Sequence, residues 1–285
     1  MNGPRAALLP GGRLHLQHGP IDLVIGARGP ASEVEAAYAQ ATARFETVLG
    51  ALVEELPLLR QPLGTTRPLP RGTVARRMVE AVWPHRAVFI TPMAAVAGAV
   101  ADEILAALVR GRTLAKGYVN NGGDIALHLA AGEHFRAGIV PDESVPVPAG
   151  FATIDAASPV RGIATSGWRG RSLSRGIADS ATVLAANAAM ADAAATMVAN
   201  AVDADHPAVQ RLPARDVRDD SDLGDIPVTV AVGSLPPEAI ARALGAGAGE
   251  ARRLRAAGLI EGAALSLAGV WRLEGGDASL LREAG

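Results

Sequence analysis

The chain has 285 residues, of which 49% are hydrophobic, and its 27 basic and 29 acidic side chains leave a net charge of −2. This length and apolar content are sufficient for a substantial core. The near-neutral charge and the 3% of aromatic residues make nucleic acid an unsuitable partner. Since the chain contains no cysteine, disulfides, thiolate catalysis and cysteine-bound zinc or iron–sulfur clusters are excluded.

Two apolar stretches bear on whether the chain carries a targeting segment or a membrane-spanning segment. The first twelve residues, MNGPRAALLPGG, have an apolar run that is short and is interrupted by proline and glycine, unlike a secretory signal. The most apolar later stretch, residues 88–109, contains Pro92 and the acidic pair Asp102 and Glu103. We therefore expect a cytoplasmic protein without a membrane span or a membrane partner.

The first half of the chain predicts a hairpin followed by helices. Residues 13–17 and 21–25 read as two strands joined at HGP, and a helix is expected over residues 32–56, with Ser32 as its N-cap and Pro57 as its stop. Residues 73–82 form a short helix. Thr91 and Pro92 have the residue types of an N-cap and first helical position, for a helix that runs to Gly111.

The second half predicts mostly antiparallel strands. Residues 117–140 read as a three-stranded meander, and the segments VRGIATSG and GIADSATVLAA as two more strands around WRGRSLSR. A helix follows over residues 187–200, and after a polar stretch the strand IPVTVAV leads to two helices and a hairpin. Runs of strands and helices with few crossover units predict an α+β fold, which we expect to be one domain over residues 1–285.

The helix at NAAMADAAATMVAN carries a polar stripe. Asp192, Thr196 and Asn200 are spaced four residues apart and therefore share one face of an otherwise apolar helix. Asp192 and Thr196 offer the hard oxygen ligands that Mg²⁺ or Ca²⁺ prefers. The alternative is structural: Asp192 caps a helix or pairs with an arginine, and Thr196 bonds back to a carbonyl.

Two polar loops are further candidates. In NNGGD, residues 120–124, paired glycines allow close approach of the backbone to a phosphate or metal, although an ordinary tight turn has the same composition. In ATSGWRGRS, residues 164–172, hydroxyls, glycine amides and two arginines suit an anion. A solvated loop is the alternative there, because 26 of the 27 basic residues are arginine and arginine clusters carry little information.

The order VNNGGD, GIATSG and ADAAAT resembles that of the ApbE-like FAD:protein FMN transferases. The chain is most similar to an uncharacterised branch of that superfamily, which shares TPMAAVAGAVAD, the S-L-S-x-G-x-AD segment and ADAAATMVAN. The resemblance extends from the N-terminal hairpin to DLGDIPVTVAVG. It implies an ApbE-like α+β fold and an activity that involves flavin nucleotides.

The resemblance also implies a set of site residues. Asp192 and Thr196 would hold Mg²⁺ together with a backbone carbonyl near the glycine-rich turn. The FAD or FMN site would involve the following residues: Asn121, Gly122, Gly123, Asp124, Thr165, Ser166, Gly167 and Arg171. In the transferases Mg²⁺ bridges the FAD diphosphate, and a threonine hydroxyl of an acceptor protein attacks phosphorus and expels AMP.

One segment departs from the family pattern. Transferases usually carry a HHIIDP-like segment after TSG, where this chain has RSLSRGIADS, without histidine or Asp-Pro. Asp179 is a candidate substitute acid, or else a strand-end residue that bonds its own backbone. Arg171 stands where a histidine is expected and can hold phosphate but cannot act as a general base.

These observations leave two functions open. The first is a flavin-nucleotide-binding, Mg²⁺-dependent protein that transfers FMN from FAD to an acceptor protein or cleaves the FAD diphosphate. The second is a non-catalytic flavin or nucleotide carrier, or a partner-recognition protein, that has lost the transferase activity. A homo-oligomer is compatible with both functions, and the sequence assigns no catalytic residue.

Overall fold

The computed structural model describes residues 3–140, 147–148, 150–275 and 281–283. Its contacts divide the chain into two compact units. Unit 1 comprises Met1–His134, Asp155–Ala164 and Ala185–Ala193, and unit 2 comprises Phe135–Ile154, Thr165–Leu184 and Ala194–Gly285. The single domain expected over residues 1–285 stays a prediction, and each unit is described here by itself.

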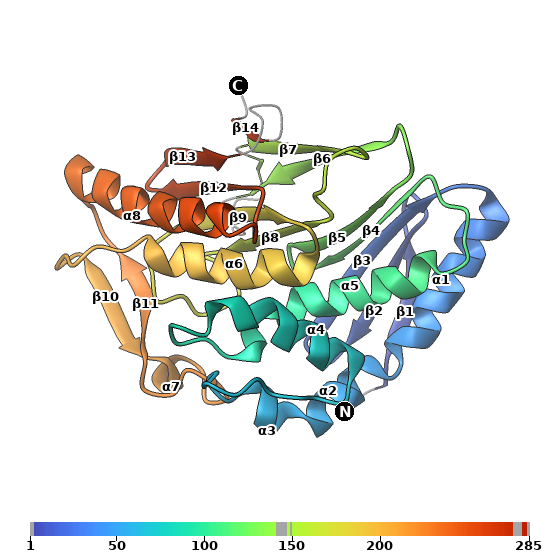
Figure 1. Ribbon diagram of the computed structural model, residues 1–285, viewed down its shortest axis with the longest axis horizontal. Coiled ribbons are helices and arrows are strands. Elements are labelled where there is room, and N and C mark those ends of the chain that lie inside the picture. Colours follow the sequence, from blue (N-terminus) through green and yellow to red (C-terminus); the bar gives the residue numbers. More distant parts are fainter. Residues whose placement is uncertain (1–2, 141–146, 149, 276–280, 284–285) are drawn as a thin grey trace. The chain divides into compact units, whose positions relative to one another are not determined.

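Unit 1 is built on an antiparallel sheet (Figure 1). Its strands are β1 (Arg5–Leu9), β2 (Arg13–His18), β3 (Ile21–Arg28), β4 (Lys116–Asn121), β5 (Asp124–Leu129) and β8 (Gly162–Ser166), in that order across the sheet. Along β2 and β3 alternate residues are buried, among them Leu14, Leu16, Leu23 and Ile25, as a sheet covered on one face requires. The predicted β2–β3 hairpin is confirmed, with Leu16 opposite Leu23.

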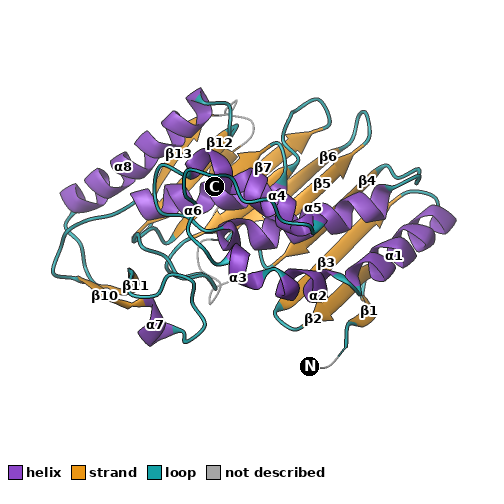
Figure 2. Ribbon diagram, turned by 60° about the horizontal axis from the view of Figure 1, so that its bottom comes forward, coloured by secondary structure: helices purple, strands orange, loops and turns teal. Residues whose placement is uncertain are grey.

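Helices cover one face of this sheet, as the views in Figures 1 and 2 show. They are α1 (Ala31–Phe45), α2 (Val48–Glu54), α3 (Leu56–Leu59), α4 (Thr73–Val82) and α5 (Val96–Val109), with 3-10 turns at Trp83–His85 and Pro92–Ala95. The predicted helix over 73–82 is confirmed. The predicted helix over 32–56 is wrong, because three helices occupy this stretch and Pro30 rather than Ser32 is the N-cap. Pro57 does not stop a helix, since it lies in the first turn of α3, where proline is tolerated.

Helix α5 is the core helix of unit 1. Together with the preceding turn it forms the stretch Pro92–Val109, which is long and apolar enough to cross a membrane by composition, yet 61% of it is buried inside the protein. Its acidic residues Asp102 and Glu103 are also buried and are hydrogen-bonded. These properties are those of a core helix.

Unit 2 contains three groups of antiparallel strands. They are β14-β7-β6 (Leu281–Glu283, Gly150–Asp155, His134–Ile139), β9-β12-β13 (Ser180–Ala185, Gly262–Leu267, Val270–Gly275) and β10-β11 (Val209–Pro213, Pro227–Val232). Its helices are α7 (Ala214–Val217) and α8 (Pro237–Ala256). The meander is predicted only in part, because β6 pairs with β7 while β8 takes the place beside β5. A single α8 stands where two helices were expected.

Helix α6 (Ala188–Ala201) contributes residues to both units, with the boundary after Ala193. Asp192 is therefore described with unit 1, and Thr196 and Asn200 with unit 2. Each unit combines antiparallel strands with helices, which confirms the predicted α+β class.

Candidate functional site

Asp192 lies against the start of helix α5. Its Oδ2 accepts a hydrogen bond of 3.0 Å from the backbone N–H of Gly98. The first N–H groups of a helix lack partners within the helix and carry partial positive charge. The carboxylate of Asp192 thus caps a helix, as the structural alternative for this residue predicted, although the helix is not its own.

Asp102 makes the reciprocal contact. It lies on α5, and its Oδ1 and Oδ2 accept hydrogen bonds from the N–H groups of Ala188 and Ala189 at 3.0 and 2.9 Å, at the start of α6. Each helix therefore supplies a carboxylate to the N-terminus of the other. The close approach depends on Gly98, since a Cβ there would lie 2.3 Å from the Ala188 carbonyl oxygen.

Both carboxyl groups have raised pKa values. Burial raises the pKa of Asp192 from 3.8 to about 7, against the hydrogen bonds from Gly98 and Ala97, and the negative charge of Asp102 raises it further. Burial also raises the pKa of Asp102 from 3.8 to about 6, opposed by the two α6 amides. Asp192 retains some solvent exposure. It is thus a carboxylate whose ionised form a nearby cation would stabilise.

The glycine-rich turn contributes Asn121 to the same place. Gly122 and Gly123 have φ of 62° and 108° and form the two-residue turn between β4 and β5, with Asn121 opposite Asp124. The side chain of Asn121 donates a hydrogen bond of 3.1 Å to the carbonyl of Ala97. The backbone is thus that of an ordinary hairpin turn, and Asn121 and Asp192 bond opposite sides of the Ala97–Gly98 peptide group, at its carbonyl and its N–H respectively.

The TSG segment belongs to unit 2. Thr165 shares a hydroxyl hydrogen bond of 2.8 Å with Thr182, and Ser166 is partly exposed. Gly167 approaches the neighbouring backbone closely, since a Cβ there would lie 2.4 Å from the Asp179 carbonyl oxygen. Arg171 is exposed. The glycine is therefore required by packing, and Arg171 is accessible to an anion.

Asp179 holds this segment in place. Its Oδ1 accepts hydrogen bonds from the Trp168 indole at 3.1 Å and from Arg169 at 2.8 Å, and its Oδ2 accepts one from the backbone N–H of Ala268 at 2.6 Å. Ala268 lies in the β12–β13 turn with φ of 51°. The carboxylate is thus a structural acceptor between the TSG segment and a hairpin.

The last residue of the polar stripe is also structural. Asn200 Oδ1 accepts hydrogen bonds from the backbone N–H of Arg175 at 2.9 Å and from the Ser174 hydroxyl at 3.5 Å. Thr196 is partly exposed on the same helix. The side chain of Asn200 therefore has a structural role, because it binds residues 174–175. Asp192 and Thr196 are the remaining residues of the stripe that offer oxygen ligands.

Among the residues that the structure describes, no three His, Cys, Asp or Glu side chains form a group that could hold a metal ion.

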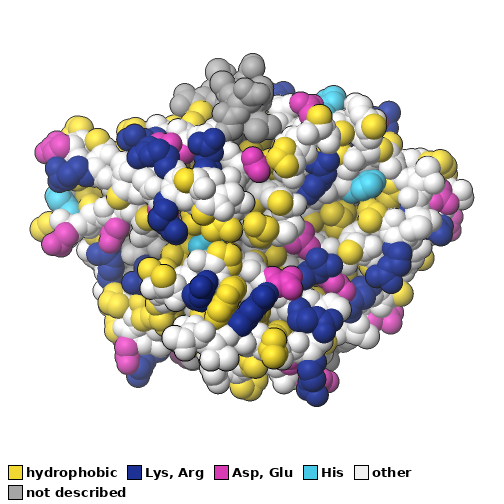
Figure 3. Space-filling model, in the orientation of Figure 1, with side chains coloured by type: hydrophobic (Ala, Val, Ile, Leu, Met, Phe, Trp, Pro, Cys, Tyr) yellow, Lys and Arg dark blue, Asp and Glu magenta, His cyan; other side chains and the backbone are white. Residues whose placement is uncertain are grey.

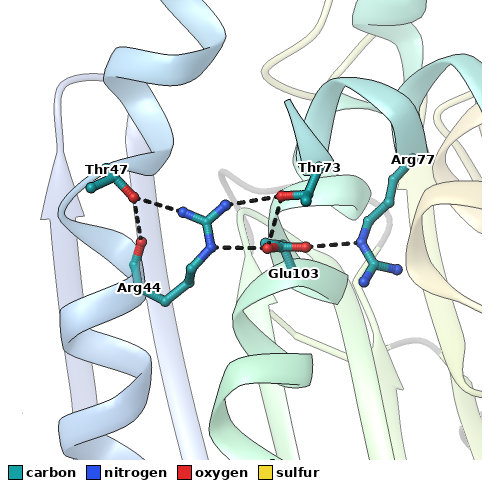
Figure 4. A network of polar contacts seen from close by, with 5 residues as sticks. All are labelled: Arg44, Thr47, Thr73, Arg77 and Glu103. Atoms are coloured by element: carbon teal, nitrogen blue, oxygen red, sulfur yellow. Dashed lines mark hydrogen bonds and ion pairs between the residues drawn. The ribbon is translucent and has the colours of Figure 1, made fainter. Parts of the chain in front are cut away.

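A buried charge network on α5 was not predicted from the sequence (Figure 4). Glu103 accepts hydrogen bonds from Arg44 of α1 at 2.9 Å, from Thr73 at 2.9 Å and from Arg77 of α4 at 3.1 Å. Burial alone raises the pKa of Glu103, but these hydrogen bonds outweigh it and hold the pKa below 4.5. The only sequence signal was an acidic residue in an apolar helix. The network fixes α1 and α4 to the helix that Asp192 caps.

The chain was compared with known proteins. No curated protein matches it. Among solved structures, the apo form of the flavinyl transferase ApbE of Pseudomonas stutzeri is similar, with 14% identity, a TM-score of 0.36, and coverage of 70% of this chain and 84% of that one. A family model described as "AbpE bacteria" matches residues 5–273, and since this is nearly the whole sequence, the chain belongs to that family, which confirms the ApbE-like resemblance.

Proposed function

We propose that the protein binds a flavin nucleotide with Mg²⁺ and either transfers FMN from FAD to an acceptor protein or cleaves the FAD diphosphate. Family membership supports a role in flavin chemistry. The observation that carries the proposal is the state of Asp192, a sheltered carboxylate with a pKa raised to about 7 beside a second carboxylate. Retaining such a group is costly unless a cation offsets its charge.

The residues present are compatible with a hard cation. Asp192 accepts hydrogen bonds from the backbone N–H groups of Gly98 and Ala97, and a carboxylate oxygen that accepts one hydrogen bond has a further lone pair. We assign Asp192 and Thr196 as Mg²⁺ ligands, with a backbone carbonyl near Asn121–Gly123 as the third.

The remaining assignments concern the nucleotide. Bound Mg²⁺ would neutralise charge on a diphosphate and so favour substitution at phosphorus. On the protein side, Asn121, Gly122, Gly123 and Asp124 would position the nucleotide from unit 1. Thr165, Ser166, Gly167 and Arg171 would hold its anionic groups through hydroxyl, amide and guanidinium donors.

A non-catalytic carrier is the second candidate, and the state of Asp179 favours it. The chain lacks the HHIIDP-like segment, and Asp179, the candidate substitute acid, already accepts hydrogen bonds from two side chains and a backbone amide. A carboxylate that is held in this way is a poor proton-transfer group. Binding would then persist without turnover.

The experiment measures binding and turnover separately. FAD and ADP binding are followed by calorimetry with and without Mg²⁺, for the wild type, for Asp192→Asn and for the exposed control Asp205→Asn. Reactions with FAD, Mg²⁺ and a candidate acceptor protein are then assayed for AMP, for free FMN and for FMN bound to the acceptor. We expect Mg²⁺ to strengthen nucleotide binding in the wild type and in the control, and to have no effect in Asp192→Asn.

Each outcome selects one function. AMP with protein-bound FMN identifies a transferase, and AMP with free FMN identifies a hydrolase. Mg²⁺-dependent binding without either product identifies the carrier. Absence of any flavin-nucleotide binding would refute both candidates, and an unchanged Mg²⁺ response in Asp192→Asn would refute the metal assignment.

A further inference from the structure

The charge of this chain is unevenly distributed. Residues 56–101 contain six arginines and one glutamate, for a net charge of +5, while the rest of the chain, with 21 basic and 28 acidic residues, carries −7. This segment lies within unit 1 and includes α3, α4 and the loop between them. Residues 156–178, with four arginines and no acidic residue, show a similar bias, so charge alone does not single out residues 56–101.

Part of this positive charge is exposed. Arg77 is bound to buried Glu103, and Arg86 stacks on Trp83 at 4.6 Å. Arg67, Arg71 and Arg76, in contrast, are exposed. Figure 3 shows Lys and Arg side chains around α4 with apolar side chains among them.

Two of the exposed arginines, Arg67 and Arg76, lie near the exposed Glu80 of α4. Arg67 forms a long ion pair of 3.8 Å with Glu80, and both side chains are well solvated, at 44% and 66% exposure, so the pair is weak. Arg76 precedes Glu80 by one helical turn and therefore lies on the same helix face. A stronger acidic partner could displace Glu80 at little cost.

An apolar residue stands between the arginines. Residues 67–71 read RPLPR, here named the RPLPR loop, and Leu69 is 87% exposed. The loop is fixed rather than loose, since Pro70 is buried and the Glu55 carboxylate accepts hydrogen bonds of 2.7 Å from the N–H groups of both Arg71 and Gly72. A leucine on a fixed, proline-restricted loop is ordered before it meets a partner, which reduces the entropy cost of binding.

This region is connected to the candidate site. Helix α4 follows the RPLPR loop directly, and its residues Thr73 and Arg77 bond Glu103 on α5. The first turn of α5 is the one that Asp192 caps. A partner bound at the loop is therefore held by the same helices that position Asp192.

We propose that the RPLPR loop and the adjoining face of α4 form a docking site for an acidic segment of a protein partner that also offers an apolar side chain to Leu69. We identify this partner with the acceptor protein of the proposed function, and only this identification rests on that function. A short acidic segment interacts mainly with charges within about 8 Å, the Debye length at physiological salt. Long polyanions such as RNA or an anionic membrane would also meet the acidic remainder of the chain, and residues 60–72 hold no aromatic side chain for stacking on bases.

The test uses a short fluorescein-labelled peptide with glutamates around a central leucine, and the full-length protein without flavin. We expect saturable binding that weakens as salt rises. Arg67→Glu with Arg71→Glu should weaken it at least about tenfold, and Leu69→Ser about fivefold, because charge and apolar contact both contribute. A peptide with glutamine in place of glutamate should bind poorly.

The matched control is the pair Arg5→Glu and Arg242→Glu, which reverses two exposed arginines elsewhere and should change affinity by less than about twofold. Equal losses in the two double variants would overturn the proposal, as would failure of the peptide to bind. So would tighter binding of single-stranded RNA or phosphatidylserine vesicles than of the peptide. Calorimetric FAD binding by the same variants is expected to be unchanged, so loss of docking is distinguishable from failure of the proposed flavin function.

Discussion

Replacing Asp192 by asparagine should make the protein more stable at alkaline pH when no metal is present. Asparagine remains neutral at every pH, and its carbonyl oxygen can still accept the Gly98 N–H that Asp192 Oδ2 accepts. The aspartate, in contrast, must ionise in a buried place beside Asp102. The variant therefore removes the cost of that charge and keeps the cap.

The sign and size follow from linkage. The pKa of Asp192 is 3.8 in the unfolded reference and about 7 in the folded protein, so between these values the folded state holds a proton that the unfolded chain has released. The free energy of unfolding of the wild type therefore falls as pH rises through this window. A shift of this size corresponds to about 4 kcal/mol, and we expect about 2–4 kcal/mol because relaxation around the two carboxylates reduces it.

The assay is urea unfolding with EDTA at a series of pH values between 5 and 8, on the wild type, Asp192→Asn and the exposed control Asp205→Asn. From the acidic to the alkaline end, the stability of Asp192→Asn relative to the wild type should rise by about 1–2.5 kcal/mol, because only the part of the interval from 3.8 to 7 that lies above pH 5 is sampled. The control should follow the wild type. Parallel wild-type and Asp192→Asn profiles would refute the reasoning, since they would mean that Asp192 ionises without cost.

Three further changes test separate contacts. Gly98→Ala should lower the free energy of unfolding by about 1–3 kcal/mol, because the new Cβ would lie 2.3 Å from the α6 backbone. Gly50→Ala in α2, where the added Cβ meets open space, should be neutral or stabilising. Equal effects of the two substitutions in thermal unfolding would contradict this packing. Glu103→Gln should cost about 2–4 kcal/mol in urea unfolding at neutral pH. Because the folded-state pKa of Glu103 lies below 4.5, this cost should shrink as acid protonates the wild type, and a pH-independent difference would argue against the ion pairs. Asp179→Asn should shift the tryptophan emission by weakening the hold on Trp168, and an unchanged spectrum would contradict that role.

Local sequence patterns predicted the elements that short-range chemistry determines. The β2–β3 hairpin and helix α4 have the expected positions, because apolar alternation and helical periodicity act within a few residues. The single helix predicted over residues 32–56 is wrong, because such local patterns do not show where the chain turns. Its composition suits one long helix, but burial of Val48, Leu49 and Leu52 in α2 depends on how the chain turns against the core.

Strand partners were less predictable than strands. Nothing in the meander shows that β6 leaves β5 and pairs with β7, since sequence alternation sets which face is buried but not which strand lies alongside. Proximity at the site has the same limit. Asn121 and Asp192 were both candidates from the sequence, but their bonds to one shared peptide group, Ala97–Gly98, were not predictable, because Gly98 lies 94 positions before Asp192.

Charge accounting at the α5 and α6 N-termini explains why the pKa of Asp192 is raised further than that of Asp102. Two helix ends supply about half a positive charge each, against two full negative charges on Asp102 and Asp192. Arg77 also lowers the pKa of Asp102, whereas the neighbouring charge that acts on Asp192 is Asp102 itself. When both carboxyl groups are ionised, about one negative charge is thus left uncompensated, and it weighs more on Asp192, whose pKa is raised to about 7. Asparagine, serine and aspartate are comparable helix caps, so reciprocal capping by itself does not require the second negative charge. The excess charge is therefore the feature that packing does not explain and that binding of a cation at Asp192 would.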